Sequence, residues 1–579
     1  MLHSVAAALV LLAGFAPTLT SARQPLPDGN GDCKCFPGDE CWPGPEAWAK
    51  LNSTVAGRLI ETVPLASPCH DPDYDEAKCS AIREQWTWPR VHMESSSSIM
   101  MNIFTNGSCE PFQPRSSPCL LGNYVRYAVD VAGPGDVIAA LQFAEDHNLR
   151  FVIRNTGHDL IGRSTGAGAL AIWTHHLKSI QVVDWHDERH RGKALKLGAG
   201  VQGLDALEAA RREGLVVVTG HCPSVGIAGG YTQGAGHSML STAFGLAADN
   251  TLEFQVITPS GQLVTASPSS HSDLFWALNG GGGGNYGVVV SMTVKAHPDA
   301  VTSGASFELI VPEANRERLV QAVDALHAAL PEMVDSGIAL AYSFNETSLI
   351  LMGLTAFNKT MDHVQEAIKP LQDAVADIGL ALDIRFTEFS NFFDHHIHYT
   401  GSPPDHFMPI NVELLGGRLL PRKVASRLSG TWRKLVAMGV TVLSGGLDVS
   451  RFGADGTNAV LPQWRESVAN LCLILPWSFE KPFEVMAAEQ DRITREIQPV
   501  IEAATPGAGA YMNEADFQQP DFQETFYGAN YPRLLEVKRR YDPRSTLYVR
   551  TGVGSEDWTA RQDGRLCRSI QRTIAAGRG

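Results

Sequence analysis

The chain has 579 residues, too many for a single hydrophobic core, so two or more domains are expected. Its composition, 44% hydrophobic and 19% charged, is that of a folded protein and excludes an extensively disordered one. The formal net charge of -15 argues against nucleic acid or an anionic membrane as a partner. We interpret the acidic surface as serving solubility.

Residues 1–22 are predicted to be a secretory signal peptide. Val5 to Ala16 is an apolar run too short to span a bilayer, and Thr20-Ser21-Ala22 fits a cleavage site. The alternative is a buried N-terminal helix, because only the α-amino group and His3 supply positive charge before the run. Four glycosylation sequons support export, although chance also yields a few in a chain this long. They begin at Asn52, Asn106, Asn345 and Asn358. No later window supplies ~18 uninterrupted apolar residues, so the mature protein is expected to be secreted and soluble.

Cysteines are concentrated in the Pro- and Gly-rich residues 23–118 and just beyond them. Such an irregular segment buries little apolar surface, so disulfides are expected to restrain it. Zinc is the alternative, but no C-x2-C pair occurs in the chain. The most local pairings are Cys69 with Cys79 and Cys109 with Cys119. Two further bonds would join Cys33, Cys35, Cys41 and Cys567, and one of them would tie down the C-terminus. Cys472, in an apolar run, is expected to be a buried free thiol.

Residues 119–300 alternate helix-like and strand-like patterns. Pro134 to Asn148 has a Pro-Gly-Asp start and amphipathic spacing, which predict a helix. A second helix is predicted over Leu204 to Glu213, and a hairpin over Phe254 to Ala266 around a Pro-Ser-Gly-Gln turn. Further strands are predicted at Leu149 to Ile153, Ser179 to Val183, Ala194 to Leu197 and Leu215 to Val218.

Two of these strands lead into glycine-rich loops that each carry one reactive side chain. Phe151 to Ile153 is followed by Arg154-Asn155-Thr156-Gly157-His158-Asp159 and then by glycines up to Gly168. Leu215 to Val218 is followed by Thr219-Gly220-His221-Cys222 and a glycine track that ends at His237. Glycine lets the backbone approach something flat or anionic, so both loops are predicted to line a ligand site.

The glycine run Asn279 to Gly287 is not a nucleotide-binding motif of the two common kinds. No Lys-Ser/Thr pair follows it, and a predicted helix (Asp273 to Leu278) precedes it while a strand (Val288 to Val294) follows. That order is the reverse of a Rossmann motif.

Together these motifs resemble the berberine bridge enzyme-like branch of the vanillyl-alcohol oxidase superfamily, which has a PCMH-type FAD-binding fold. The likeness rests on both loops, on Gly284-Asn285-Tyr286-Gly287, on Tyr511-Met512-Asn513-Glu514-Ala515-Asp516 and on Gly552-Val553-Gly554. It covers roughly residues 119–299 and 505–558. One departure is Thr156, where many members have glycine.

The resemblance implies an α+β fold with bicovalently bound FAD. A PCMH-type FAD-binding domain of two α/β subdomains (119–299) would be followed by a substrate cap (300–504) and a C-terminal segment that returns to the FAD domain (505–579). His158 and Cys222 would bond to the flavin. Other residues implied at the cofactor are Arg154, Asn155, Thr156, Gly157, Asp159, Ser164, Gly220, Val225, Gly226, Gly229, Gly230, Gly234, Gly236, His237, Val289, Tyr511 and Asn513. For Asp159, orienting His158 and capping a turn are both open.

In the cap region, a predicted helix (Glu313 to Leu330) and strands (Ile338 to Tyr342, Leu349 to Leu354) favour helices packed on one face of an antiparallel sheet. A segment with His395, His396, His398 and His406 is interpreted as a polar loop, with metal ligation or base catalysis as the alternative. Asn411 and Glu413 are predicted to share one strand face. Glu413 is either a buried base, or base-orienting group, or a solvent-facing side chain.

The last segment adds two candidate functional residues. Tyr511 and Asn513 are expected on one face of a short extended run, and Phe526 to Tyr541 is predicted to be a helix. The resemblance implies that Tyr511 is the catalytic base, although a tyrosine that packs in the core or on the flavin is equally open. It also implies that Val225, three places after Cys222, governs access of O₂; the alternative is that Val225 only packs beneath the ring.

The resulting expectation is a secreted, monomeric, FAD-dependent oxidase of a small molecule. It would oxidise an alcohol of a carbohydrate or secondary metabolite, with O₂ reduced to hydrogen peroxide and no metal required. The alternatives are an oxidative cyclase or desaturase, a dehydrogenase with a quinone-like acceptor, and a glycoprotein that keeps the fold only for binding.

Overall fold

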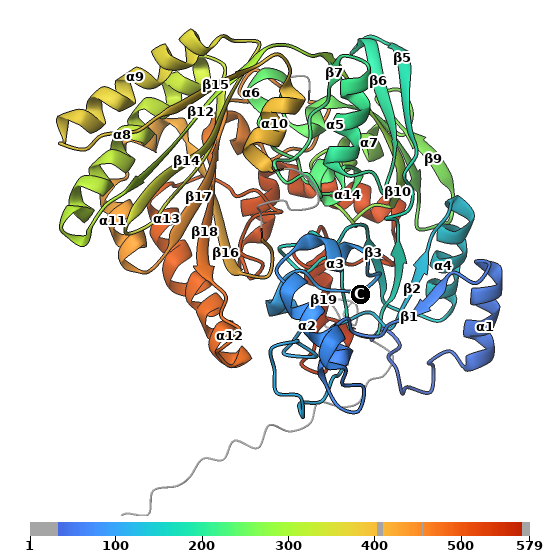
Figure 1. Cartoon of the computed structure of the whole chain (residues 1–579). Helices are drawn as coiled ribbons and strands as arrows, with labels where there is room; N and C mark the ends of the chain where they lie inside the picture. The colour runs from blue at the N-terminus through green and yellow to red at the C-terminus, as the bar shows by residue number, and fades with distance from the viewer. Residues whose placement is uncertain (1–32, 402–408, 454–455, 570–579) are drawn as a thin grey trace, which may run out of the picture.

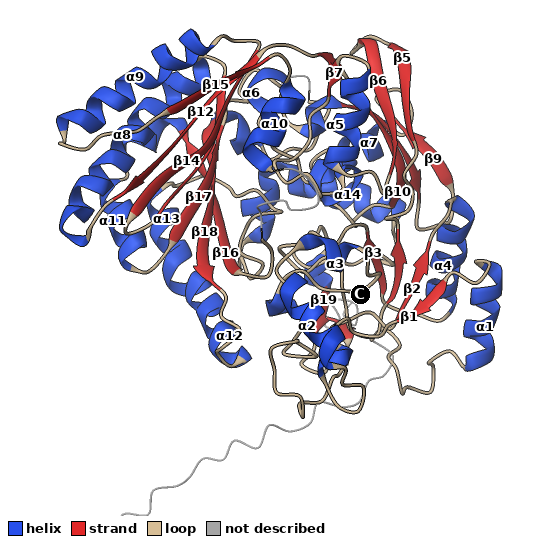
Figure 2. Cartoon of the chain, in the orientation of Figure 1, coloured by secondary structure: helices blue, strands red, loops and turns tan. Residues whose placement is uncertain are grey.

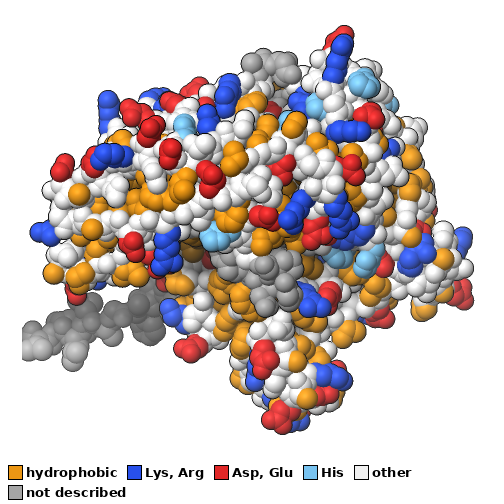
Figure 3. Space-filling model, turned by 45° about the horizontal axis from the view of Figure 1, so that its top comes forward, with side chains coloured by type: hydrophobic (Ala, Val, Ile, Leu, Met, Phe, Trp, Pro, Cys, Tyr) orange, Lys and Arg blue, Asp and Glu red, His pale blue; other side chains and the backbone are white. Residues whose placement is uncertain are grey.

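The computed structural model describes residues 33–401, 409–453 and 456–569. Figure 1 shows two sheet-containing halves that face each other, with the C-terminal segment returning to the half that holds the glycine loops. The signal peptide predicted at residues 1–22 lies outside the described residues. No helix of the described residues is both long enough and apolar enough to cross a membrane. On the face drawn in Figure 3, acidic and basic side chains are interspersed.

The first half begins with a four-stranded sheet in the order β1-β2-β4-β3, in which β2, β4 and β3 are parallel. Helix α4 packs on it through buried Val137, Leu141 and Ala144, as its amphipathic spacing predicts. The elements are α1 (Pro45–Thr54), β1 (Leu59–Glu61), α2 (Glu76–Gln85), α3 (Pro89–Met93), β2 (Tyr127–Asp130), α4 (Pro134–Asp146), β3 (Phe151–Arg154) and β4 (Leu170–Trp173).

An antiparallel five-stranded sheet, β5-β6-β10-β8-β9, completes this half. The predicted hairpin is present, with Phe254 opposite Ala266. The elements are β5 (Ile180–His186), β6 (Arg191–Gly198), α5 (Gly203–Arg212), β7 (Leu215–Val216), α6 (Ser241–Phe244), β8 (Thr251–Ile257), β9 (Leu263–Ala266), α7 (Ser272–Leu278), β10 (Val288–Lys295) and β11 (His297–Pro298).

The second half is a seven-stranded antiparallel sheet in the order β15-β12-β14-β13-β17-β18-β16. Its elements are β12 (Thr302–Ile310), α8 (Arg316–Asp335), β13 (Ile338–Phe344), β14 (Ser348–Phe357), α9 (Met361–Asp377), β15 (Arg385–Phe389), α10 (Phe392–Thr400), β16 (Glu413–Pro421), α11 (Ser429–Ala437), β17 (Thr441–Gly446), β18 (Ser467–Pro476), α12 (Phe483–Arg492) and α13 (Gln498–Ala504). Figure 2 shows α8, α9 and α11 on the outer face of this sheet.

The alternation of side chains along β18 explains why helices cover only one face of this cap sheet. Leu471, Leu473 and Leu475 are buried in one core with residues of the covering helices. Asn470 and Cys472, at the alternate positions of the strand, belong to the opposite face, toward the first half of the molecule. A sheet with one apolar and one mixed face is expected to carry its helices on the apolar side.

Two cap predictions were wrong in detail. The histidine-rich segment is not a loop: Asn391 caps helix α10 by accepting a hydrogen bond from Asp394 N at 2.9 Å. His395 and His396 are buried in this helix, and His406 lies outside the described residues. Asn411 precedes β16 with φ of 62°, so it does not share a strand face with Glu413.

Two C-terminal predictions also need correction. Residues 511–514 form a turn instead of an extended run, with Glu514 N donating to Tyr511 O at 2.9 Å. The predicted helix Phe526 to Tyr541 is interrupted at Gly528, whose φ is 54°, and α14 spans only Tyr531–Tyr541. The segment ends with the hairpin β19 (Trp558–Ala560) and β20 (Leu566–Arg568).

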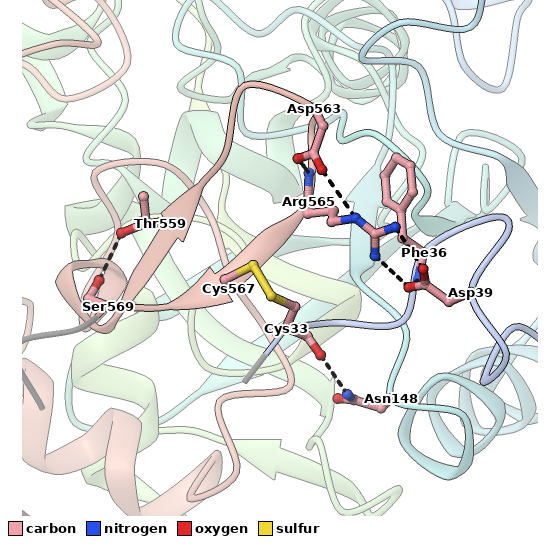
Figure 4. The surroundings of a disulfide bond; sticks show 9 residues. All are labelled: Cys33, Phe36, Asp39, Asn148, Thr559, Asp563, Arg565, Cys567 and Ser569. Carbon is pink, nitrogen blue, oxygen red and sulfur yellow. Dashed lines mark hydrogen bonds and ion pairs between the residues drawn. A yellow bond between two sulfur atoms is a disulfide. The ribbon is translucent and has the colours of Figure 1, made fainter. Parts of the chain in front are cut away.

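All eight cysteines expected in disulfides are bonded, and Cys472 is a buried free thiol as predicted. The pairs are Cys33–Cys567, Cys35–Cys41, Cys69–Cys79 and Cys109–Cys119. Figure 4 shows that the first bond joins the two ends of the described chain, beside an ion pair between Arg565 and Asp39 at 2.7 Å. Among the described residues, the one group spaced for a metal is Cys35, Asp39 and Cys41, and its cysteines are disulfide-bonded.

Removal of the Cys33–Cys567 bond should lower thermal stability. The double variant Cys33→Ser/Cys567→Ser is expected to lose about 4 kcal/mol, or about 3 °C in the midpoint of unfolding, because this bond closes a long loop. Calorimetry of the oxidised proteins provides the measurement. Cys69→Ser/Cys79→Ser, which opens a short loop, is the control and should shift the midpoint less. Equal midpoints for the wild type and the Cys33/Cys567 variant would contradict this account.

Candidate active site

A cavity of about 360 Å³ lies where the two halves and the C-terminal segment meet. Nearly all residues that the sequence placed at a cofactor or in catalysis line it. They are Asn155, Thr156, Gly157, His158, Asp159, Ser164, Gly220, Cys222, Val225, Gly226, Gly229, Gly230, His237, Val289, Glu413, Tyr511 and Asn513. Arg154, Gly234 and Gly236 do not line it. The cavity therefore brings together residues that are more than 350 positions apart in the chain.

The two reactive side chains converge on one hydroxyl. His158 Nε2 lies 2.8 Å from Ser224 Oγ, and Cys222 Sγ lies 3.3 Å from the same oxygen. Burial raises the pKa of the Cys222 thiol, and the hydrogen bonds around Ser224 offset this only in part. The loops after β3 and β7 thus present a nitrogen and a sulfur to one corner of the cavity.

Asp159 caps the first loop. Its carboxylate accepts hydrogen bonds from Ser164 N at 2.6 Å, Ser164 Oγ at 2.8 Å and Ile161 N at 3.2 Å. These bonds fix the turn that follows His158. Of the two open interpretations of Asp159, the turn-capping one fits the structure.

Arg154 supports the same loop from outside the cavity. Its guanidinium is buried, lies against Gly157 and donates to His92 O at 3.0 Å. Gly157 has φ of 84°, and a Cβ there would lie 2.4 Å from Arg154 Nη2. The sequence placed Arg154 at the cofactor, whereas the structure places it beneath the loop that holds His158.

The second loop leaves open space along the cavity. A Cβ at Gly229 would meet no atom within 4 Å, and one at Gly230 would meet only Asn513 Oδ1 at 3.9 Å. Gly234 and Gly236 serve packing instead, because a Cβ there would lie within 2.7 Å of Asn513 and Ala247 respectively. Bare backbone along one wall suits a flat ring system.

Unsatisfied buried amides indicate that this space takes a polar ligand. Asn155 Oδ1 and Gln233 Oε1 both belong to side chains that line the cavity. Neither oxygen has a hydrogen-bond partner among the described residues. Buried amide oxygens without a partner are rare in folded proteins. A planar ligand with hydrogen-bond donors, such as FAD, therefore fits this wall.

The opposite wall carries an ionic cluster that sequence reasoning did not identify. His237 Nε2 lies 3.0 Å from Glu514 Oε1, and Asn470 Nδ2 donates to Glu514 Oε2 at 2.6 Å. Cys472 Sγ lies 3.5 Å from the same carboxylate oxygen. His237 was expected only at the cofactor. The sole sequence signal for Glu514 was its place directly after Tyr511 and Asn513.

The two members of this ion pair shift each other's pKa. Burial lowers the pKa of His237, but the charge and hydrogen bond of Glu514 outweigh it and raise that pKa overall. Burial raises the pKa of Glu514, but His237 and the hydrogen bonds from Cys472 and Asn470 lower it overall. The pair is therefore charged at mildly acidic pH.

Tyr511 and Glu413 flank the ion pair. The Tyr511 hydroxyl accepts a hydrogen bond from Asn513 Nδ2 at 2.9 Å. Burial, and then the charge of Glu514, raise the pKa of Tyr511 far above its usual value, so this tyrosine stays protonated. Such a hydroxyl is suited to donate a hydrogen bond and poorly suited to act as a base. Glu413 begins β16, is half-buried and lines the cavity; burial, and then Glu514, raise its pKa to about 7.

Comparisons with known proteins agree with the site. The "FAD binding domain" family matches residues 125–267, and the "Berberine and berberine like" family matches residues 510–554. The FAD-linked oxidoreductase ZEB1 of Gibberella zeae is 49% identical over 540 residues, which cover 93% of this chain and 96% of that protein. The VAO-type flavoprotein oxidase VAO615 of Thermothelomyces thermophilus is 40% identical over 572 residues, covering 96% and 98%.

A solved structure shows the same fold over nearly the whole chain. The VAO-type flavoprotein MtVAO615 from Myceliophthora thermophila superposes with a TM-score of 0.89 at 39% identity, covering 93% of this chain and 100% of that one. Fold and site together define an FAD-linked oxidoreductase. The chain belongs to the berberine bridge enzyme-like family of VAO-type flavoproteins.

Filling the bare wall of the cavity should reduce FAD binding. Gly230→Ala places a methyl group where the cofactor would lie, and overpacking of this kind costs about 1–3 kcal/mol. The purified variant is expected to carry less FAD, measured as the ratio of flavin to protein absorbance. Gly135→Ala in α4, where a Cβ meets nothing within 4 Å, is the matched control and should bind FAD normally. A full complement of FAD in Gly230→Ala would contradict the assignment of this wall.

Proposed function

We propose that this protein is a secreted, monomeric oxidase that holds FAD through both His158 and Cys222 and oxidises an alcohol on a largely apolar small molecule. The observation that carries the covalent part is the convergence of the two side chains on Ser224. Each attachment would replace a C–H bond of the flavin with a C–N or C–S bond, and the two electrons and two protons released would pass to O₂ to give hydrogen peroxide. Four disulfides support an oxidising compartment.

The chemistry divides between cofactor and protein. When bound, FAD supplies a two-electron acceptor for the hydride of the carbinol carbon, and O₂ then takes up two electrons and two protons to give hydrogen peroxide. The protein orients the alcohol, provides a base for its hydroxyl proton and excludes water. Tyr511, held protonated, is placed to donate a hydrogen bond to the substrate oxygen.

The lining of the cap wall supports an apolar substrate over a carbohydrate. Ala341, Met352, Leu415, Leu443 and Ile474 all face the cavity. The polar groups of this wall are gathered around Glu413, Asn470 and Cys472, next to the ion pair. A sugar presents hydroxyl groups on every side, and burying them against apolar side chains leaves hydrogen bonds unmade. A secondary-metabolite alcohol with one polar end matches the wall better.

Both flavin bonds are testable by mass. Peptides containing His158 and Cys222 should be recovered joined to one flavin after digestion, and the denatured protein should remain yellow. His158→Ala or Cys222→Ala alone should retain the cofactor through the other bond, whereas the double variant should release it on acid precipitation. Free FAD released from the wild type by acid would overturn the covalent proposal.

Val225 is proposed to control access of O₂. It lines the cavity three residues after Cys222, and its backbone N–H donates to Cys222 O at 3.3 Å, which holds the backbone of Val225 next to Cys222. An added methylene in a packed path costs about 1–3 kcal/mol, so Val225→Leu should slow reoxidation roughly tenfold or more. Reduction by substrate should change little.

Stopped-flow mixing of the reduced protein with O₂ measures this step, and the anaerobic reduction rate of the same variant is the internal control. Equal reoxidation rates would show that Val225 does not limit O₂. Reoxidation of the wild type over minutes would favour the dehydrogenase alternative.

A further inference from the structure

The ion pair in the cavity wall is held from three sides. Glu514 contacts His237 Nε2 through both carboxylate oxygens, at 3.0 and 3.1 Å. On the cap sheet, Asn470 and Cys472 bind the same carboxylate. The His237 ring also packs edge to face on Tyr511, with ring centroids 5.3 Å apart. These contacts fix the orientation of the imidazole and place its second nitrogen.

That second nitrogen, Nδ1, faces Gly445 in the cap sheet. A Cβ on Gly445 of β17 would lie 3.6 Å from Nδ1 and 3.7 Å from Cε1, and it would meet no other atom within 4 Å. Gly445 and His237 both line the cavity. No described residue is hydrogen-bonded to Nδ1. No side chain of Gly445 therefore covers this nitrogen at the cavity that both residues line.

Strand register creates this arrangement. Gly445 of β17 pairs with Asn470 of β18, and Gly417 of β16 pairs with Cys472 on the other side of β18. A Cβ on Gly417 would lie 2.1 Å from Glu514 O, so glycine there lets the C-terminal segment approach the sheet. One glycine admits Glu514 and the other leaves His237 Nδ1 uncovered. Gly417 therefore acts at the Glu514 end, and Gly445 at the His237 end, of the same ion pair.

We propose that His237 Nδ1 is the base that accepts the hydroxyl proton of the substrate. Glu514 is the residue that positions this imidazole and stabilises its protonated form. This inference rests on the proposed alcohol oxidation and names its base. The Nε2–H donates to Glu514, which leaves Nδ1 with a lone pair in the neutral tautomer. Proton transfer turns the pair into imidazolium and carboxylate, which attract each other. The carbinol carbon of the same alcohol would give its hydride to FAD when that cofactor is bound.

The other candidate groups in the cavity suit this role less well. Tyr511 is held protonated by burial and by Glu514. Glu413, at the start of β16, is protonated below about pH 7, because burial and then Glu514 raise its pKa. Burial, and then the charge of His237, lower the pKa of His221 to about 4, so this imidazole is a weaker base.

The rate at which substrate reduces the flavin of the anaerobic holoenzyme tests the proposal. His237→Gln keeps a donor toward Glu514 but removes the base, so the reduction rate with a saturating primary alcohol should fall at least 100-fold, within the usual range for a general base. His327→Gln is the matched control: His327 is buried on the opposite face of the cap sheet, bonded to Tyr342. Its reduction rate should stay within about twofold of the wild type, because it touches no cavity residue named here.

The pH profile separates a base from a structural residue. His237 must be neutral to accept a proton, so the rate should rise as pH increases through its pKa. Loss of the negative charge in Glu514→Gln lowers that pKa and should move the rising limb to lower pH, whereas Glu514→Asp should restore it toward the wild type. Charged or titrating groups around the ring are Glu514, Glu413, Cys472, His221, Tyr511 and Tyr231. If His237 and not Glu413 sets the rising limb of the pH profile, that limb should persist in Glu413→Gln.

A second readout does not depend on turnover. In protein labelled with [13C]histidine, the His237 resonance, assigned by its loss in His237→Gln, should titrate above pH 6.5 in the wild type and lower in Glu514→Gln. An unchanged titration, or an unchanged reduction rate in His237→Gln, overturns the proposal. If no alcohol reduces the flavin of the wild type, the proposed function fails instead. The resonance still reports whether Glu514 raises the pKa of His237.

Discussion

The active site depends on the approach of His158 and Cys222 to the hydroxyl of Ser224. His158 and Cys222 come from loops about sixty residues apart, yet each lies within 3.3 Å of this one oxygen. Such convergence requires two strands to end at the same edge of the cavity and two loops to turn without bulky side chains. Glycine provides both conditions, at Gly157 above buried Arg154 and at Gly229 and Gly230 along the bare wall. The rest of the first half of the molecule keeps these loops in place.

The cap sheet contributes hydrogen bonds to the charged groups that lie in the buried cavity. Removing an ion pair from water is costly unless each charge keeps its hydrogen bonds. Glu514 keeps bonds to His237, Asn470 and Cys472, so three chain segments share one carboxylate. A similar connection joins the halves at a distance from the cavity, where Arg465 of the cap region binds Asp249 at 2.8 and 2.9 Å. Paired charges of this kind hold the cap over the first half.

Local patterns in the sequence were sufficient for much of the fold and for the two proposed flavin anchors. Helix α4 and the β8–β9 hairpin follow from spacing and turn residues, and His158 and Cys222 stood out as single reactive side chains in glycine loops. The ionic cluster could not be found in that way. Its geometry depends on the register of β18 with β16 and β17, which sets Gly417 and Gly445 beside Cys472 and Asn470. Register between distant strands leaves no local signal.

The most direct test of the account follows one alcohol through both halves of the reaction. The purified protein is mixed without oxygen with an apolar primary alcohol, the flavin absorbance is recorded, and a known amount of O₂ is then added while peroxide is measured. The account predicts bleaching by the alcohol, return of the colour within seconds, and one hydrogen peroxide for each alcohol oxidised. A colourless protein, or a flavin that no alcohol bleaches, would contradict it.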